Sequence, residues 1–179
     1  MGIQQQHLNV LAFPSPSLLS ILKFTFHLIS SDVQMVKPVK LGGWGGSGGL
    51  PHDIDGQSKR LVKIVIRSGD AINSLAFEYV DQDGKKKTAG PWGGSDGSST
   101  TIEFRSDEYL TKVSGTTGTF DRIPVVRSLR FVTNKEEYGP FGQEEGTPFS
   151  IPVASGQVVS FYVRSSGYVD AIGLYVVPA

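Results

Sequence analysis

The sequence predicts an all-β fold in which three similar small sheets pack around a pseudo-threefold axis. A glycine–aromatic motif recurs three times, and its aromatic residues, Trp44, Trp92 and Phe141, are 48 and 49 residues apart. The segment 66–75 is also echoed at 163–172. After the amino-terminal region, the chain is a series of short β-branched and aromatic runs without a helical period. A repeat near fifty residues indicates three units, each too small to bury its inner face alone, which therefore close on one another.

The first 34 residues differ in composition from the rest of the chain. Their only full charges are Lys23 and Asp32, and the run 18–29 is mostly apolar. This run is too short to cross a bilayer, which needs about twenty residues. No Lys or Arg precedes it and no small-residue cleavage site follows, so a secretory signal is the less favoured interpretation. We expect residues 1–34 to be an amino-terminal extension, disordered or absent from the mature fold, and residues 35–179 to be the folded domain.

The folded part contains short runs rich in β-branched and aromatic residues, separated by Gly, Pro, Asp and Ser. Such runs are typical of strands in a sandwich, barrel or prism. Asp81–Gly84 is a turn signal, and the basic run Lys85–Lys87 that follows it is interpreted as a solvated hairpin tip. Strands are predicted at 61–67, 74–80, 100–104, 109–114, 129–133, 149–153, 158–164 and 171–177.

The repeated segment differs between its copies at one position. A third, fainter copy covers residues 125–131. At the matching position the three copies carry Asn73, Arg127 and Asp170. Only one copy therefore keeps a carboxylate, which indicates a three-unit scaffold with one working polar site.

The overall composition excludes several classes of partner. The 179 residues include 17 Lys and Arg and 17 Asp and Glu, so the formal net charge is zero. Nothing draws such a chain toward nucleic acid or an anionic membrane, and no segment is long enough to span one. The chain has no cysteine, hence no disulfide framework. A reducing compartment fits this, and we expect a cytoplasmic location that extends to the nucleus, with secretion through residues 1–34 as the alternative.

No cofactor or metal site is predicted. The glycine-rich loops lack the Gly-Lys-Ser/Thr sequence of phosphate-binding P-loops. His7, His27 and His52 have no ligand spacing between them. Asp53 and Asp55 flank one residue and could face a cation, but the calcium-loop pattern is missing, which favours a structural turn.

Three motifs together resemble the jacalin-related lectins, most closely the mannose-specific branch of grasses and other plants. They are the segments Leu41–Gly49, Gly90–Gly94 and Ser166–Tyr175, and the resemblance spans residues 36–179. It implies a β-prism of three four-stranded Greek-key sheets, in agreement with the repeats. It also implies a homo-oligomer, either a dimer or a tetramer, with roles in stress or defence.

The resemblance implies a sugar site between a glycine loop and a Gly-x-x-x-Asp loop. By position, Asp170 would accept hydrogen bonds from two neighbouring hydroxyls, and the amides of Gly49, Gly167 and Tyr168 would donate to sugar oxygens. The Tyr168 ring would form an apolar wall. Here the first glycine of the motif is replaced by Ser166. If that position needs a positive φ, serine strains it by roughly 1–2 kcal/mol unless Gly167 forms the turn instead.

The predicted function is therefore a lectin for mannose/glucose-type glycans. The galactose-binding branch of the family is cut just before the equivalent of Gly49, whereas here residues 45–51 run on without an evident processing peptide. A galactose-preferring lectin remains an alternative.

The loop carrying Gly69, Asp70 and Asn73 is interpreted as a degenerate second site. Asn73 accepts one bond without charge, and Arg127 in the third copy offers no acceptor. For Trp44 and Trp92, packing of strand ends against the core is favoured over stacking on a sugar.

Two other classes of function are alternatives to the lectin. A glycosidase needs two carboxylates converging on one bond, about 5–9.5 Å apart, and no loop motif marks such a pair among the acidic residues. The acidic residues considered for such a pair are Glu103, Asp107, Glu108, Glu136 and Glu137. We therefore expect no enzyme activity. A protein-interaction or assembly module on the same prism remains the third class.

Overall fold

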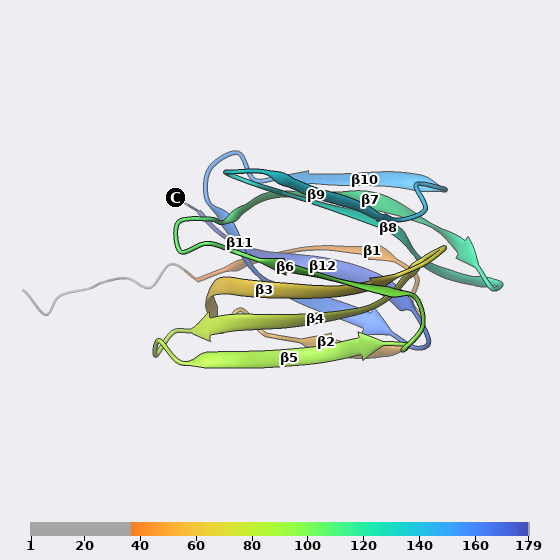
Figure 1. Ribbon diagram of the computed structural model, residues 1–179, viewed down its shortest axis with the longest axis horizontal. Helices are drawn as coiled ribbons and strands as arrows, with labels where there is room; N and C mark the ends of the chain where they lie inside the picture. The colour runs from red at the N-terminus through yellow and green to blue at the C-terminus, as the bar shows by residue number, and fades with distance from the viewer. Residues whose placement is uncertain (1–36, 179) are drawn as a thin grey trace, which may run out of the picture. The chain divides into compact units, whose positions relative to one another are not determined.

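The computed structural model describes residues 37–178, and these form twelve β-strands with no helix among them (Figure 1). The predicted extension, residues 1–34, lies outside the described residues. The strands are β1 Val39–Gly45, β2 Leu50–Asp53, β3 Ser58–Ser68, β4 Ile72–Asp81, β5 Lys86–Gly93, β6 Ser98–Glu103, β7 Leu110–Phe120, β8 Ile123–Thr133, β9 Glu137–Gly142, β10 Thr147–Pro152, β11 Gln157–Ser165 and β12 Val169–Val177.

The strands form three four-stranded antiparallel units, as predicted. Their orders are β6-β3-β4-β5, β10-β7-β8-β9 and β2-β11-β12-β1. Among residues 37–178, the strand pairing between the last two units is limited to Val158 with Leu110. Each order places the fourth strand of a unit beside its first, which is the Greek-key arrangement. The fold prediction is confirmed, down to the three Greek keys.

One unit is assembled from both ends of the domain. Its inner hairpin, β11–β12, comes last in the sequence, whereas its outer strands, β1 and β2, come first. The first and last strands of the domain therefore pair with each other, from Val39 opposite Val176 to Gly45 opposite Ala171. This pairing brings the glycine loop after β1 beside the start of β12.

The core lies where the inner faces of the three units meet. Phe161 of β11 stacks on Phe77 of β4 at 5.0 Å between ring centroids and meets Phe131 of β8 edge-on at 6.1 Å. One aromatic cluster thus connects all three units, and each such pair contributes about 0.5–1.5 kcal/mol beyond area burial. Trp44 and Trp92 pack against this core, which confirms their predicted structural role.

The basic run after the first turn lies differently from the prediction. The turn is closed before the lysines, because the amide of Gly84 donates to the Asp81 carbonyl at 3.0 Å. Lys86 and Lys87 then begin β5 instead of forming the hairpin tip. Lys86 pairs across the sheet with Glu78 at 3.3 Å, a solvent-screened contact that adds little to stability.

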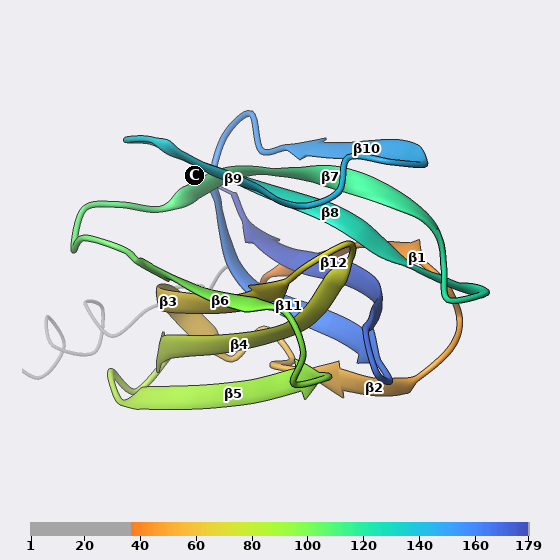
Figure 2. The same ribbon diagram turned by 45° about the vertical axis from the view of Figure 1, so that its right-hand side comes forward.

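The turns of the three inner hairpins and the three glycine loops gather at one end of the domain, on the right of Figure 1. Figure 2 shows the β11–β12 turn and the β1–β2 loop from a second angle. In the described part of the chain, no helix is long and apolar enough to cross a membrane.

Candidate functional site

Asp170 is the most unusual side chain at this end of the domain. It is the second residue of β12 and only 3% exposed, and its Oδ2 has no hydrogen-bond partner among the described residues. A buried carboxylate oxygen without a partner is expensive, because the charge has lost its water. The Asp170 carbonyl is already engaged, since it accepts from the Gly46 amide at 2.7 Å. The free oxygen is therefore the feature that calls for a ligand.

The glycine loop after β1 packs directly on this carboxylate. A Cβ at Gly48 would lie 2.9 Å from Asp170 Oδ1, and one at Gly49 would lie 2.5 Å from Oδ2. Gly49 also has a φ of +62°, a conformation that other residues adopt only with strain. Arg164 fixes the loop, donating to the carbonyls of Gly48 and Gly49 at 2.8 Å each.

The turn between β11 and β12 forms the other side of the site. It is closed by the Ser166 amide, which donates to the Tyr168 carbonyl at 2.9 Å. Neither Ser166 nor Gly167 is among the residues with a positive φ, so the strain considered for serine does not arise. A Cβ at Gly167 would meet none of the other described residues within 4 Å. The replacement of the motif glycine by Ser166 therefore leaves the turn unstrained.

The two loops that adjoin the carboxylate carry backbone amides that can donate to a ligand. The amides of Gly49, Gly167 and Tyr168 belong to loops, and none of them donates in the turn and loop hydrogen bonds of residues 37–178. The predicted residues Gly49, Gly167, Tyr168 and Asp170 are thus brought to one place. Fixed amide donors beside a charged acceptor suit a ligand whose groups both donate and accept.

Tyr168 is held by the neighbouring hairpin. Its hydroxyl donates to Asp121 Oδ2 at 3.0 Å, and its ring meets Phe120 edge-on at 5.3 Å. The hydrogen bond to Asp121, more than burial, raises the pKa of Tyr168. Sequence reasoning missed Asp121 because the β7–β8 turn contains no glycine, although Asp121 and Arg122 both adopt positive φ. The sequence signal for this turn is the pair Asp121 and Arg122 between two runs of strand-forming residues, a spacing typical of a two-residue hairpin turn.

The loop predicted as a degenerate second site has the same backbone geometry as the first. The Asn73 carbonyl accepts from the Gly94 amide at 2.9 Å, and the Gly69 amide donates to the Ala71 carbonyl at 3.1 Å. Asn73 is 6% exposed and its Oδ1 also lacks a partner in the described chain. The Asp70 carbonyl accepts from Arg127. A neutral amide oxygen thus replaces the carboxylate.

At the third equivalent position the Arg127 side chain fills the site. Its carbonyl accepts from the Gln143 amide at 3.0 Å, as the equivalent carbonyls do in the other two copies. The guanidinium donates to Asp70 and Thr119 carbonyls and to Glu145, and it lies over the Phe120 ring at 5.1 Å. A guanidinium at this position offers a ligand no acceptor.

The acidic residues weighed as a catalytic pair have structural partners. Glu108, which is 2% exposed, accepts from Thr133 at 2.8 Å, from Tyr138 at 2.9 Å and from the Arg105 amide at 3.2 Å. The others form ion pairs: Glu103 with Lys63, Asp107 with Lys135, Glu136 with Arg105, and Glu137 with Arg130.

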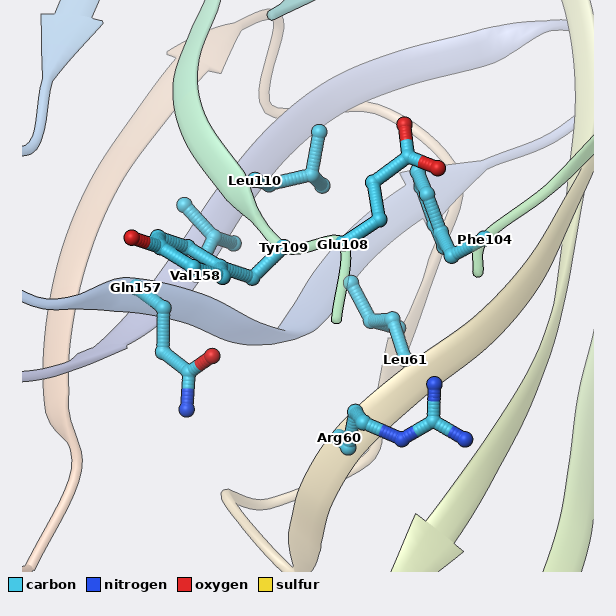
Figure 3. Close-up of a pocket in the computed structure, with 8 residues that line it drawn as sticks. All are labelled: Arg60, Leu61, Phe104, Glu108, Tyr109, Leu110, Gln157 and Val158. Atoms are coloured by element: carbon cyan, nitrogen blue, oxygen red, sulfur yellow. The ribbon is translucent and has the colours of Figure 1, made fainter. Parts of the chain in front are cut away.

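The cavity beside Glu108 is too small for a sugar. Its volume is about 10 Å³, and Figure 3 shows the Glu108 carboxylate beside Phe104, with Arg60 and Gln157 farther along the lining. Such a volume is about one water molecule in size. The loop between β6 and β7 that carries Glu108 lies at the opposite end of the domain from the β11–β12 turn (Figures 1 and 2).

The pair Asp53 and Asp55 forms a turn, in line with the structural interpretation. Asp53 Oδ1 accepts from the Asp55 amide at 2.7 Å, while Oδ2 accepts from Lys40 and Tyr175 at 2.7 and 3.0 Å. Within residues 37–178 no group of three or more His, Cys, Asp or Glu side chains is arranged to hold a metal ion.

Comparison with known proteins identifies the family to which the chain belongs. The profile of the jacalin-like lectin domain matches residues 41–175, from the first strand to the last. The chain belongs to the jacalin-like lectin family. Horcolin of Hordeum vulgare is 38% identical over 146 residues, which cover 80% of this chain and all of Horcolin.

Solved structures of jacalin-related lectins match the same region. AcmJRL, a mannose-binding lectin from Ananas comosus, is 55% identical with a TM-score of 0.78, covering 80% of this chain and 99% of its own. A mannose-specific lectin from Morus nigra, solved in complex with mannose, is 36% identical with a TM-score of 0.71, covering 83% and 99%. The predicted family and its β-prism fold are therefore confirmed for this jacalin-like lectin.

Proposed function

We propose that this jacalin-like lectin binds mannose/glucose-type glycans at Asp170 and releases them unchanged. The observation that carries the proposal is the buried Asp170 Oδ2, which has no hydrogen-bond partner among residues 37–178, together with the amides of Gly49, Gly167 and Tyr168 in the adjoining loops. The relatives described as mannose binding, from Ananas comosus and Morus nigra, support the choice of sugar.

A neutral hexose has the hydrogen-bonding groups that match this site. Each sugar hydroxyl is both donor and acceptor, so two neighbouring hydroxyls can donate to the Asp170 carboxylate while accepting from backbone amides. Hydrogen bonds to a charged group contribute about 1.5–3 kcal/mol each, more than neutral ones. Binding costs no side-chain rotamer entropy at the amides, because they belong to the backbone, which is already fixed. The Tyr168 ring, held by Asp121 and Phe120, offers its surface to the C–H groups of the sugar.

One such site holds a monosaccharide weakly. A shallow site with a few hydrogen bonds corresponds to a Kd of about 1 mM, or about −4 kcal/mol. Useful avidity requires several sites acting together, through a dimer or tetramer of this chain or through a multivalent glycan. We include that homo-oligomer in the proposal.

The first prediction is that Asp170→Asn weakens binding of methyl α-mannoside about tenfold or more, because the charged acceptor is lost while the shape is kept. Titration calorimetry measures the affinity, and thermal unfolding confirms that the variant is folded. Unchanged affinity in a folded variant would remove Asp170 from the site.

The matched control is Asn73→Ala, at the equivalent position of the second unit. It is expected to leave both the affinity and the stoichiometry for methyl α-mannoside unaltered. Halved stoichiometry would show that the second loop binds sugar as well. A glycan array then distinguishes the classes: binding of mannosides without turnover supports the lectin, binding of galactosides the other branch, and silence the protein-interaction module.

A further inference from the structure

The glycine loop of a neighbouring unit touches the turn of the sugar site. A Cβ added at Gly94, in the β5–β6 loop, would lie 2.3 Å from the Gly167 carbonyl oxygen and 3.2 Å from its carbon. The two segments belong to different units and lie side by side at the right of Figure 1 and again in Figure 2. Gly94 is not among the residues of 37–178 with a positive φ. The close approach to Gly167, and not the backbone conformation, is therefore what requires glycine at this position.

The contacted carbonyl shares a peptide group with one of the proposed sugar donors. The Gly167 carbonyl and the Tyr168 amide belong to the same peptide group, which is planar and rigid. A push on the carbonyl oxygen therefore turns the Tyr168 N–H as well. A binding group must be held within about 0.5 Å of its productive position, so a displacement of this peptide changes the hydrogen bond that Tyr168 offers to a ligand.

Gly94 is anchored more firmly than the turn that it contacts. Its amide donates to the Asn73 carbonyl at 2.9 Å, and Trp92, two residues earlier, packs on Phe77 of the core at 5.6 Å between ring centroids. Gly167 is exposed, and none of the other described residues lies within 4 Å of its Cβ position. A side chain at position 94 would therefore displace the turn of the sugar site rather than the loop that carries it.

The same contact occurs in a second pair of units and is replaced in the third. Each unit has a carbonyl three residues before the strand carbonyl that accepts from a loop amide. In the β7–β8 hairpin this residue is Pro124, and a Cβ at Gly46 would lie 2.5 Å from its oxygen. In the β3–β4 hairpin it is Asp70, whose carbonyl accepts from the Arg127 guanidinium, and the equivalent loop position carries Gln143. Glycine is thus present where the loop itself packs on the next unit's carbonyl.

We infer that Gly94 is a positioning residue of the sugar site, supplied by a unit other than the one that carries Asp170. By packing on the Gly167 carbonyl, it sets the direction in which the Tyr168 amide points at the bound hexose. The inference rests on the proposed function. The affinity for mannose or glucose therefore depends on how two units pack together, and not only on the loops of one unit.

Gly94→Ala tests the inference with methyl α-mannoside as the ligand. The affinity measured by titration calorimetry should fall about fivefold, the loss expected when one neutral hydrogen bond is misdirected. In the amide NMR spectrum of the unbound variant, the signal of Tyr168 should move, although Tyr168 belongs to another unit. A structural change confined to the β5–β6 loop would leave that signal in place.

The matched control is Gly69→Ala, in the β3–β4 turn of the same unit as Gly94. Gly69 is exposed, and the nearest atom to a Cβ there is Asn73 Oδ1 at 3.8 Å, an ordinary contact. This variant should leave the Tyr168 signal in place and keep the affinity within about twofold. Thermal unfolding of both variants shows whether each is folded.

The unaltered protein provides the test if Gly94→Ala does not fold. On titration with methyl α-mannoside, the amide signal of Gly94 should shift together with that of Tyr168, because the two segments are in contact. The amide signal of Gln143, at the equivalent position of another unit, should stay in place. A Gly94 signal that does not respond would overturn the inference.

The outcomes separate the inference from the proposed function. A folded Gly94→Ala variant with unchanged affinity, or with lowered affinity and an unmoved Tyr168 signal, would overturn the positioning role of Gly94 and leave the Asp170 site intact. Absence of methyl α-mannoside binding to the unaltered protein would instead reject the proposed function.

Discussion

At the scale of single residues, the two glycines of the candidate site differ in whether another residue can replace them. Gly49 combines a φ of +62° with a Cβ position 2.4 Å from the Ser165 carbonyl and 2.5 Å from Asp170 Oδ2. Gly167, which follows the motif position held by Ser166, has neither a positive φ nor a neighbour from residues 37–178 within 4 Å of a Cβ. The two glycines therefore serve different purposes: one fits the backbone to the carboxylate, and the other leaves space.

The prediction that follows compares Gly49→Ala with Gly167→Ala. Alanine at position 49 adds left-handed strain of about 1–2 kcal/mol and displaces the loop, so methyl α-mannoside binding should fall at least tenfold. Alanine at position 167 should leave the unfolding temperature unchanged and alter affinity less than threefold. Thermal unfolding and calorimetry on both variants provide the measurement. Equal losses at the two positions would contradict this account of the loop.

The candidate residues were predictable only in part from the sequence. Asp170 is predictable because the repeats align and only one copy keeps an acid, and the family resemblance implies Gly49, Gly167 and Tyr168. The hydrogen bond from Tyr168 to Asp121 was not predictable, because it joins two hairpins from different units. Whether Ser166 needed a positive φ was likewise decided by the turn geometry and not by the motif.

At the scale of elements, the sequence located the inner strands and missed four outer ones. All six strands of the inner hairpins were predicted, because they are long and bury one face. The missed strands are β1, β2, β5 and β9, which are mostly exposed and rich in glycine and proline. Edge strands of this composition carry no alternation of apolar residues, and pairing with an inner strand forms them.

Glu108 shows how one side chain fixes the elements around it. It holds the loop before β7 to the β8–β9 connection through Thr133 and Tyr138. Burial by itself raises the pKa of Glu108, but the hydrogen bonds from Thr133, the Arg105 amide and Tyr138 together outweigh it and leave the pKa below the usual 4.5. The ionised form is thus the one that the folded protein prefers.

This network predicts a pH dependence of stability. Because the folded pKa of Glu108 lies below the unfolded one, its contribution is complete above pH 4.5 and is lost as the pH falls through the folded pKa. Glu108→Gln should cost about 1–3 kcal/mol of unfolding free energy at pH 7, and the difference from wild type should shrink below pH 4.5. Denaturant unfolding between pH 3 and 7 measures both. Glu103→Gln, at an exposed pair, is the control with little effect. A difference independent of pH would exclude the network.

At the scale of the whole molecule, three copies of one backbone arrangement carry three different side chains. In each copy a strand carbonyl accepts from the amide of a glycine loop: Asp170 from Gly46, Asn73 from Gly94, and Arg127 from Gln143. The backbone arrangement is thus repeated, whereas the side chain differs, and under the proposed function the side chain decides whether the loop binds a sugar. The first copy offers a carboxylate, the second an amide, and the third a cation that is used internally.

The third copy predicts a structural role for Arg127 that reaches across units. Its guanidinium joins the Asp70 carbonyl of one unit to Thr119 and Glu145 of another, at 3.1, 3.1 and 2.8 Å. Arg127→Met keeps the apolar stem but leaves two carbonyls without donors, which should cost about 2–4 kcal/mol of unfolding free energy. Methyl α-mannoside affinity at Asp170 should stay within twofold, because that loop keeps its own bonds from Arg164. Denaturant unfolding and calorimetry test both halves: unchanged stability would mean that the guanidinium does not fasten the units, and lost affinity would mean that the three loops are not independent.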